Sequence, residues 1–305
     1  HRKRGFHATG TVGVFGAVAA CGNLLGLDEE HMLSALGMAG TQASGVWAFL
    51  ADGATCKALH PARAAANGLA AAYLAHAGMT GPSGILAAED GGLFAAMTDA
   101  PEPCRLNAGL GETWEILRLD RKPYPCCRST HCAIDGALAL RAEHGLAPED
   151  IRHIEVATYE VGYRQCACSE GSVNPRTPGQ ARFSTPYAVA QAIVRGEVSL
   201  AQFTPEALEN PAVRALMQRI SVRPDEAFSA AYPSRWGCRI RIETTGGRIL
   251  ASTVSDASGS VANPLTQEQL FAKAEHLLSA AYPGREKQMC EALYGIDRSG
   301  RLPAL

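Results

Sequence analysis

The hydrophobic and polar positions follow a helical period through the first third of the chain. Between residues 11 and 97 the apolar residues recur at helical spacing. Glycine-containing stops interrupt this pattern at residues 26–28, 51–53 and 78–84. Glycine and alanine recur within the segments, and such small residues let helix axes approach closely. This part of the chain predicts three or four packed helices.

The pattern changes after Pro101. Residues 114–119 predict a strand, residues 134–144 a helix, residues 151–159 a strand with alternating apolar and polar positions, and residues 187–195 a helix. Two further alternating runs, residues 238–244 and 248–254, flank Thr245-Gly246-Gly247, which predicts a β-hairpin. Residues 268–278 and 286–293 return to helical spacing, with Thr266 as the N-cap of the first helix.

These elements predict a mixed α and β fold with two domains. We expect a large all-helical domain at residues 1–112, completed by residues 263–305, and a smaller α+β domain at residues 113–262. Strands and helices alternate too irregularly for a doubly wound parallel sheet. Gly10, Gly13 and Gly16 are spaced evenly by three, which does not match the G-x-G-x-x-G motif of dinucleotide-binding folds.

Composition excludes several classes of protein. The chain has 305 residues, 28 Lys+Arg against 30 Asp+Glu, a net charge of -2 and 47% hydrophobic residues. This near-neutral balance argues against a disordered chain and against nucleic-acid binding. Polar residues interrupt each apolar run before about 18 positions, so no membrane span is predicted. Ten cysteines, mostly isolated among apolar residues, fit reduced thiols and a cytoplasmic location.

One segment, residues 121–131, concentrates groups that could bind a ligand. It contains two prolines, two adjacent cysteines and the cations or potential cations Lys122, Arg128 and His131. Ser129 or Thr130 is expected to cap the following helix, which would hold these cations near the positive end of its dipole and favour an anionic ligand. The alternative is a stiffened loop with solvated cations.

The same segment offers thiols and an imidazole, but their spacing does not suit a metal. Adjacent cysteines rarely bind one metal ion, and the chain has no second C-x-x-C pair to complete a zinc site. We therefore expect no metal and no organic cofactor. The residues weighed for zinc are Cys126, Cys127, His131 and Cys132.

Two more candidate sites precede expected helices. Residues 5–10 read GFHATG and contain His7, and residues 56–61 read CKALHP and contain Lys57 and His60. Lys57 lies among apolar residues, where a lysine is costly unless an anion or hydrogen-bond partner meets it. Taken singly, each of the three side chains could equally be structural or solvated.

In combination and order these motifs resemble the MmgE/PrpD family, which includes 2-methylcitrate dehydratase, cis-aconitate decarboxylase and iminodisuccinate epimerase. The resemblance spans essentially the whole chain. The residues that carry it are residues 5–10 (GFHATG) with Gly13, Gly16 and Ala17; residues 57–61 (KALHP) with Ala64 and Ala65; residues 80–82 (TGP); residues 122–127 (KPYPCC) with His131; residues 181–187 (ARFSTPY); and residues 264–266 (PLT).

The resemblance implies a helical domain, a smaller α+β domain and a cleft between them. It also implies a homodimer and cofactor-free lyase or isomerase chemistry on a small polycarboxylate. By similarity, His7, Lys57, Lys122 and Tyr187 match positions that line the cleft, and His131 belongs to the same motif. In the decarboxylases a histidine occupies the position of Cys127, so this departure argues against decarboxylation.

Chemistry of this kind removes a proton from the carbon α to a carboxylate. Cations must stabilise the charge that develops on the carboxylate oxygens, and a base must lie beside the carbon. We expect Lys57 and Lys122 to hold that charge and His7 and Tyr187 to act as acid and base. The expected substrate-binding residues are His60, Arg128 and His131.

Dehydration and epimerisation both fit, and the sequence does not separate them. The alternative is a catalytically silent member that binds a carboxylate or acts as a dimeric interaction protein. Because the family members begin well before the GFHATG motif, which lies at residue 5 in this chain, we also expect the 305 residues to be a fragment with little activity alone.

Overall fold

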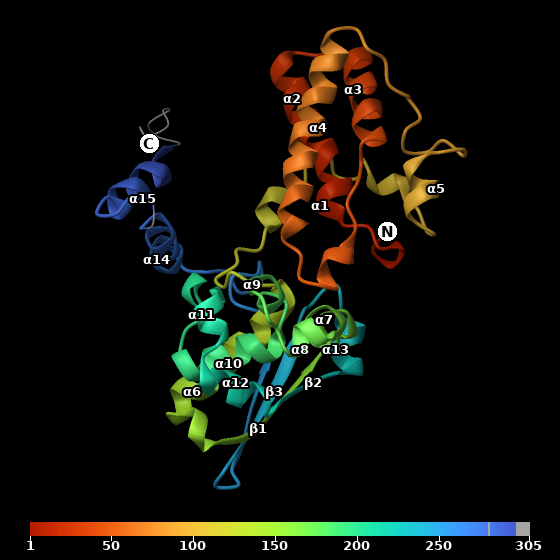
Figure 1. The fold of residues 1–305 in the computed structure, drawn as a ribbon. Coiled ribbons are helices and arrows are strands. Elements are labelled where there is room, and N and C mark those ends of the chain that lie inside the picture. Colours follow the sequence, from red (N-terminus) through yellow and green to blue (C-terminus); the bar gives the residue numbers. More distant parts are fainter. Residues whose placement is uncertain (280, 297–305) are drawn as a thin grey trace. The chain divides into compact units, whose positions relative to one another are not determined.

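The computed structural model describes residues 1–279 and 281–296, which form a mixed α and β fold (Figure 1). The chain divides into two compact units, His1–Thr113 and Trp114–Leu305. The predicted packing of residues 263–305 onto the helical domain stays a prediction.

The first unit is built around three long helices. Its helices are α1 (Ala8–Thr11), α2 (Gly13–Leu25), α3 (Glu29–Thr41), α4 (Leu59–His76) and α5 (Leu93–Met97), with short 3-10 helices at Arg2–Arg4, Trp47–Leu50, Thr55–Ala58 and Pro103–Arg105. Asp28 caps α3 by accepting a hydrogen bond from the backbone N–H of His31 at 2.9 Å. The predicted set of packed helices is confirmed.

Small residues bring α2 and α4 together. A Cβ added at Gly68 of α4 would lie 2.5 Å from the Cβ of Ala17, which no real side chain tolerates. The core of this unit is accordingly alanine-rich, with Val14 and Val18 from α2 among its buried members. Close helix packing is therefore what the glycine and alanine positions provide.

The stretch Ala8–Leu25 has a mean hydropathy of 1.5 and is long and apolar enough to cross a membrane by length and composition. The exclusion of a span from interrupted apolar runs is therefore too strict for this stretch. In the structure it is two helices, α1 and α2, and both pack against α4. Core helices of soluble proteins and signal sequences meet the same criterion, and 28% of this stretch is buried.

The second unit contains a four-stranded sheet in the order β2-β1-β3-β4. The strands are β1 (Ile151–Thr158), β2 (Ile220–Pro224), β3 (Cys238–Thr244) and β4 (Ile249–Val254). Strand β1 pairs parallel with β2 and antiparallel with β3, and β3 pairs antiparallel with β4 across the predicted hairpin. The predicted strand at residues 151–159 and the hairpin are confirmed.

Helices α6 (His131–His144) and α10 (Thr185–Arg195) supply most of the helical core against this sheet (Figure 1). Nine residues of α10 are buried, as expected for a helix enclosed on several sides. The remaining helices of this unit are α7 (Glu160–Cys166), α8 (Glu170–Val173), α9 (Pro178–Ala181), α11 (Pro205–Leu208), α12 (Pro211–Met217), α13 (Glu226–Ala231), α14 (Gln267–Leu278) and α15 (Glu286–Tyr294). Thr266 caps α14 as predicted, accepting from the Gln269 N–H at 3.3 Å.

The predicted strand at residues 114–119 is wrong. The segment forms a 3-10 helix, Glu115–Arg118, and lies outside the four-stranded sheet. Trp114 and Ile116 alternate with polar positions as in a strand, but both are exposed and no neighbouring strand pairs with them in the described part of the chain. Alternation without a hydrogen-bonding partner does not make a strand.

Candidate functional site

His7 occupies the turn that begins α1. Its backbone is extended at the N-cap position, and its N–H donates to the carbonyl oxygen of Gly45 at 3.0 Å. Its own carbonyl accepts from the Gly10 N–H, also at 3.0 Å. A Cβ at Gly10 would lie 2.1 Å from the carbonyl oxygen of Ser44, so only glycine fits there. The GFHATG motif therefore fixes the backbone of His7.

The side chain of His7 contacts that of His60, which lies in the first turn of α4. The two Nδ1 atoms are 2.7 Å apart, a hydrogen-bonding distance. Trp47 packs edge-on against His7 at 4.6 Å between ring centroids, and Phe49 lies 5.9 Å from His7 and 5.8 Å from His60. We call His7 and His60 the histidine pair. Aromatic rings hold it in place.

The surroundings of the histidine pair keep His7 neutral. Burial lowers the pKa of His7 below its usual 6.5, and the charges of His60, Lys57 and Arg2 lower it further. The Lys57 Nζ lies 6.0 Å from the centroid of the Phe49 ring. A neutral imidazole at pH 7 can accept a proton, so His7 has the protonation state that a general base requires.

A second group of polar side chains surrounds residues 120–131 of the second unit, which we call the lysine loop. Lys122 Nζ donates to the carbonyl oxygen of Cys126 at 3.1 Å, and Lys273 of α14 donates to the carbonyl oxygen of Lys122 at 2.6 Å. Asp135 of α6 accepts from the Tyr124 hydroxyl at 2.6 Å and from the backbone N–H of Ser258 at 2.7 Å. These bonds tie the loop to α6 and α14.

Arg128 and His131 form the interior of the lysine loop. The guanidinium pairs with Asp120 at 2.9 Å and contacts Nδ1 of His131 at 3.2 Å. An arginine only donates, so Nδ1 accepts and the ring proton of His131 sits on Nε2. His131 is fully buried, and its Nε2 has no hydrogen-bond partner within the described residues. The loop thus contains a buried ring nitrogen with no partner at full hydrogen-bonding geometry among the described residues.

Burial and neighbouring positive charges keep His131 neutral, as they do His7. Burial lowers its pKa to about 3, assisted by the positive charges of Arg128 and Lys122 and opposed by a contact with the Cys126 backbone. The ring also packs edge-on against Tyr124, with centroids 5.1 Å apart. His131 is therefore a fixed neutral donor among cations.

The predicted capping role of Ser129 and Thr130 is wrong. Thr130 is the N-cap residue of α6 but its side chain caps nothing, because its hydroxyl donates back to the carbonyl of Cys127 at 2.9 Å in a 3-10 turn, Arg128–Thr130. Ser129 accepts from the Tyr159 hydroxyl at 2.7 Å and donates to Gln165 at 3.0 Å. Both hydroxyls hold the loop against its neighbours instead.

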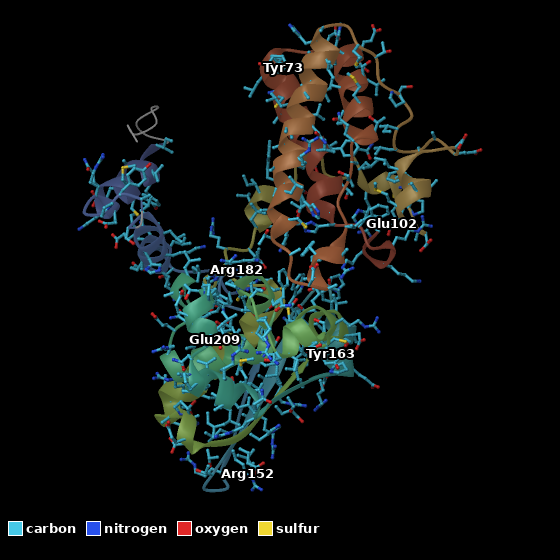
Figure 2. All side chains as sticks on the ribbon, viewed as in Figure 1. Tyr73, Glu102, Arg152, Tyr163, Arg182 and Glu209 are labelled. Atoms are coloured by element: carbon cyan, nitrogen blue, oxygen red, sulfur yellow. The ribbon has the colours of Figure 1, made fainter. Side chains whose placement is uncertain are left out.

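Cys127 is the titratable group of the lysine loop that the sequence analysis used least. Its backbone N–H donates to the carbonyl of Arg182 at 2.8 Å; Arg182 is labelled in Figure 2. A hydrogen bond from Cys166 lowers the pKa of the half-buried Cys127 thiol to about 6, with help from Ser129 and Lys122 and against the effect of burial. The neighbouring Cys126 is buried, and burial raises its pKa to about 12.

We therefore expect Cys127 to be alkylated by iodoacetamide with a half-maximal rate near pH 6. The thiolate is the nucleophile, so the rate follows its fraction. Mass spectrometry of the peptides, after short exposures between pH 5 and 9, measures each cysteine separately. The exposed Cys56, labelled in the same samples, is the control. The same pH profile for Cys127 and Cys56 would contradict the expectation.

Tyr187 lies in the core of the second unit. It is fully buried, its hydroxyl donates to the carbonyl of Gln202, and it accepts from the Gln191 amide at 2.7 Å. Its ring packs 5.8 Å from that of Phe203. Because its one proton is already committed to Gln202, the structure gives this side chain a packing role. Its role as acid or base stays a prediction.

The structure brings the predicted site residues together in two groups. His7, Lys57 and His60 meet in the first unit, and Lys122, Arg128 and His131 meet in the second. Their convergence on one cleft stays a prediction. Sequence analysis missed several contacts because no local signal marks them. These missed residues are Trp47, Phe49, Asp120, Asp135 and Cys166.

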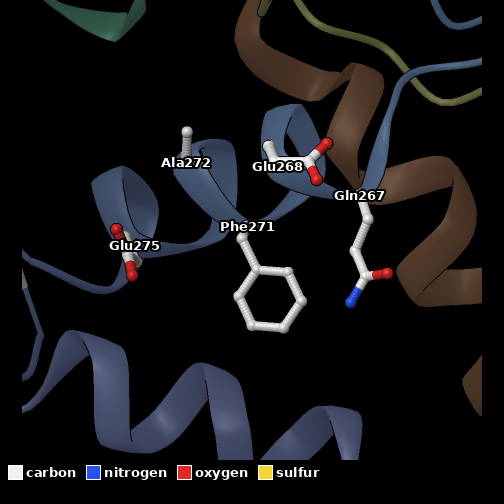
Figure 3. Close-up of a pocket in the computed structure, with 5 residues that line it drawn as sticks. All are labelled: Gln267, Glu268, Phe271, Ala272 and Glu275. Atoms are coloured by element: carbon white, nitrogen blue, oxygen red, sulfur yellow. The ribbon is translucent and has the colours of Figure 1, made fainter.

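The described residues contain no group of three or more His, Cys, Asp or Glu side chains arranged to hold a metal ion. A hollow of about 480 Å³ lies along α14, lined by Gln267, Glu268, Phe271, Ala272 and Glu275 (Figure 3). Its two carboxylates would repel an anionic ligand. This hollow therefore does not suit an anionic ligand.

Two family models match most of this chain. The model of the MmgE/PrpD N-terminal domain matches residues 1–105, and that of the MmgE/PrpD C-terminal domain matches residues 124–294. The chain belongs to the MmgE/PrpD family. The resemblance found in the sequence motifs is confirmed.

Its relatives in this family include cis-aconitate decarboxylases. Cis-aconitate decarboxylase of Aspergillus terreus is 28% identical over 313 residues, covering 97% of this chain and 63% of the relative. Cis-aconitate decarboxylase of Homo sapiens is 29% identical over 283 residues, covering 88% of this chain and 55% of the relative. The chain thus spans about three fifths of the length of the MmgE/PrpD proteins it matches.

Proposed function

We propose that this chain acts as a cofactor-independent lyase or isomerase on a small di- or tricarboxylate, removing a proton α to a carboxylate. Membership of the MmgE/PrpD family and the cis-aconitate decarboxylases among its relatives support the coarser part, a carboxylate-acting lyase. The observation that carries the proposal is the buried Nε2 donor of His131 beside Lys122 and Arg128.

Lys122 and His131 are the proposed carboxylate ligands. An ammonium has three protons, and one of those on Lys122 goes to the carbonyl of Cys126. The buried Nε2–H of His131 would gain an acceptor from a carboxylate oxygen, which removes the cost of an unsatisfied donor. Arg128 is already paired with Asp120, so we propose that it chiefly orients His131.

The histidine pair is the proposed proton-transfer group, with Lys57 beside it as a second cation. Removing the α proton leaves an electron pair on carbon that delocalises onto the carboxylate oxygens, and fixed cations stabilise that charge. A dehydratase then expels a β-hydroxyl, whereas an epimerase returns the proton to the opposite face. We favour these two outcomes over decarboxylation because Cys127 stands where the resembling decarboxylases have histidine.

The cytoplasmic location and the homodimer predicted from the sequence remain parts of this proposal, as does the absence of a metal or cofactor requirement. A silent carboxylate-binding protein would keep the lysine loop and lack proton transfer. The two functions differ in one measurable property, the exchange of a substrate hydrogen with solvent.

Incubation in deuterated buffer with a panel of di- and tricarboxylates is expected to place deuterium on a carbon α to a carboxylate. Proton NMR follows the loss of the α-hydrogen signal and also detects an eliminated or epimerised product. The same panel, tested by ligand-observed NMR, reports binding alone. Binding without exchange anywhere in the panel would favour the silent carboxylate-binding protein and contradict the proposed function.

A further inference from the structure

We propose that His7 and His60 share one proton and so present an acid and a base on adjacent rings. The proposal rests on the proposed function and adds a role for His60 as proton donor, where the sequence analysis expected only substrate binding. Its basis is the 2.7 Å contact between the two Nδ1 atoms.

The contact restricts how protons are distributed over the pair. A hydrogen bond between two Nδ1 atoms needs one donor and one acceptor. The accepting ring, if neutral, must carry its proton on Nε2, and the donating ring, if neutral, has a bare Nε2. Two neutral histidines in this arrangement therefore offer one basic nitrogen and one N–H. Neither ring has to change charge to provide both.

The surroundings favour this neutral state. Lys57 from the 3-10 helix Thr55–Ala58 and Arg2 from Arg2–Arg4 both oppose a positive charge on His7. His7 is 6% exposed, and Trp47 and Phe49 pack against its ring. Lys57 and Arg2 thus both favour a neutral His7.

Gly45 holds both members of the pair. Its carbonyl accepts from the backbone N–H of His7 at 3.0 Å, and an added Cβ would lie 3.2 Å from Cγ and Nδ1 of His60. Its φ of 123° lies where side chains are rarely accommodated. Glycine at this position therefore sets the distance between the two rings.

The shared proton gives a balanced sequence of transfers. The bare Nε2 takes the α proton as the C–H bond breaks and its electron pair passes to the carboxylate. The Nδ1 proton then moves to the second ring, whose Nε2–H protonates the departing hydroxyl, so that water leaves. Both rings are neutral again, with their tautomers exchanged. In an epimerase the second ring would return a proton to carbon instead.

The imidazole tautomers test the proposal directly. In protein with 15N-labelled histidine at pH 7.5, long-range 15N–1H NMR should show one member of the pair as the Nδ1–H tautomer and the other as Nε2–H. His7→Gln and His60→Gln variants assign the signals, and the exposed His31, which pairs with Asp28, is the reference. Two Nε2–H tautomers would overturn the proposal, because no proton would then lie between the rings.

A second measurement separates the role of His60 from the proposed function. In His60→Gln the exchange of the α proton should fall less than product formation, by a margin of about tenfold or more, because the base survives and the acid is lost. Equal losses would overturn the donor role. Absence of exchange in the unaltered protein would instead contradict the proposed function while the tautomers stay as expected.

Discussion

Replacing Lys122 with alanine is expected to lower kcat/KM by about a hundredfold or more for the carboxylate identified by the exchange panel. The ammonium is fixed by its bond to the Cys126 carbonyl, and the carbonyl of Lys122 itself is fixed by Lys273. A preorganised cation stabilises the charge that develops on the carboxylate without having to move. Removing it therefore raises the free energy of the transition state. Steady-state kinetics measures the effect in a protein that contains these 305 residues and catalyses the exchange.

Two variants control for general effects of a lost charge. Lys287→Ala removes an exposed lysine from α15 and should leave kcat/KM within about twofold. Lys122→Arg keeps the charge but replaces a compact ammonium by a planar fork, so it should recover only part of the activity. If Lys122→Ala and Lys287→Ala behaved alike, the lysine loop would not be the carboxylate site.

The elements predicted correctly are those whose signals are local. The hairpin of β3 and β4 follows from two alternating runs around Thr245-Gly246-Gly247, and α14 follows from helical spacing after Thr266. Both signals lie within a few residues of the structure that they predict. The sequence alone therefore sufficed for them.

Elements that depend on distant partners were missed or wrong. Strand β2 is five residues long and gains its place by pairing with β1, which lies about 66 positions earlier. The apolar alternation at Trp114 and Ile116 resembles a strand but lacks such a partner. Strand formation is decided by pairing across the sheet, which a local pattern does not contain.

The site divides in the same way. The sequence motifs singled out three separate segments, residues 5–10, 56–61 and 121–131, and the family resemblance implied that His7, Lys57, Lys122 and Tyr187 line one cleft. The contact between His7 and His60 joins positions 53 residues apart, and the low pKa of Cys127 depends on Cys166. Neither spacing follows a sequence rule. The protonation states required the folded arrangement, and the roles of the site residues stay predictions.

Replacing His7 with glutamine is expected to lower kcat/KM by about 10² to 10⁴, the usual contribution of a general base. Glutamine retains polarity and approximate size but has no basic nitrogen, so the loss reports proton transfer. Exchange of the α proton should fall by a similar factor, because that step itself needs the base. Deuterium incorporation and steady-state kinetics on the same samples measure both.

The pH dependence of kcat/KM tests the same role of His7. Only neutral His7 accepts a proton, and its pKa lies below 6.5, so kcat/KM of the unaltered protein should rise with pH to a plateau reached by about pH 7, with the midpoint below 6.5. The His7→Gln variant should lose this acidic limb. His31→Gln, which changes a histidine paired with Asp28, should keep both the value of kcat/KM and the acidic limb of its pH profile. An acidic limb that survives in His7→Gln would assign the titrating base to another residue, because a side chain that no longer titrates cannot produce it.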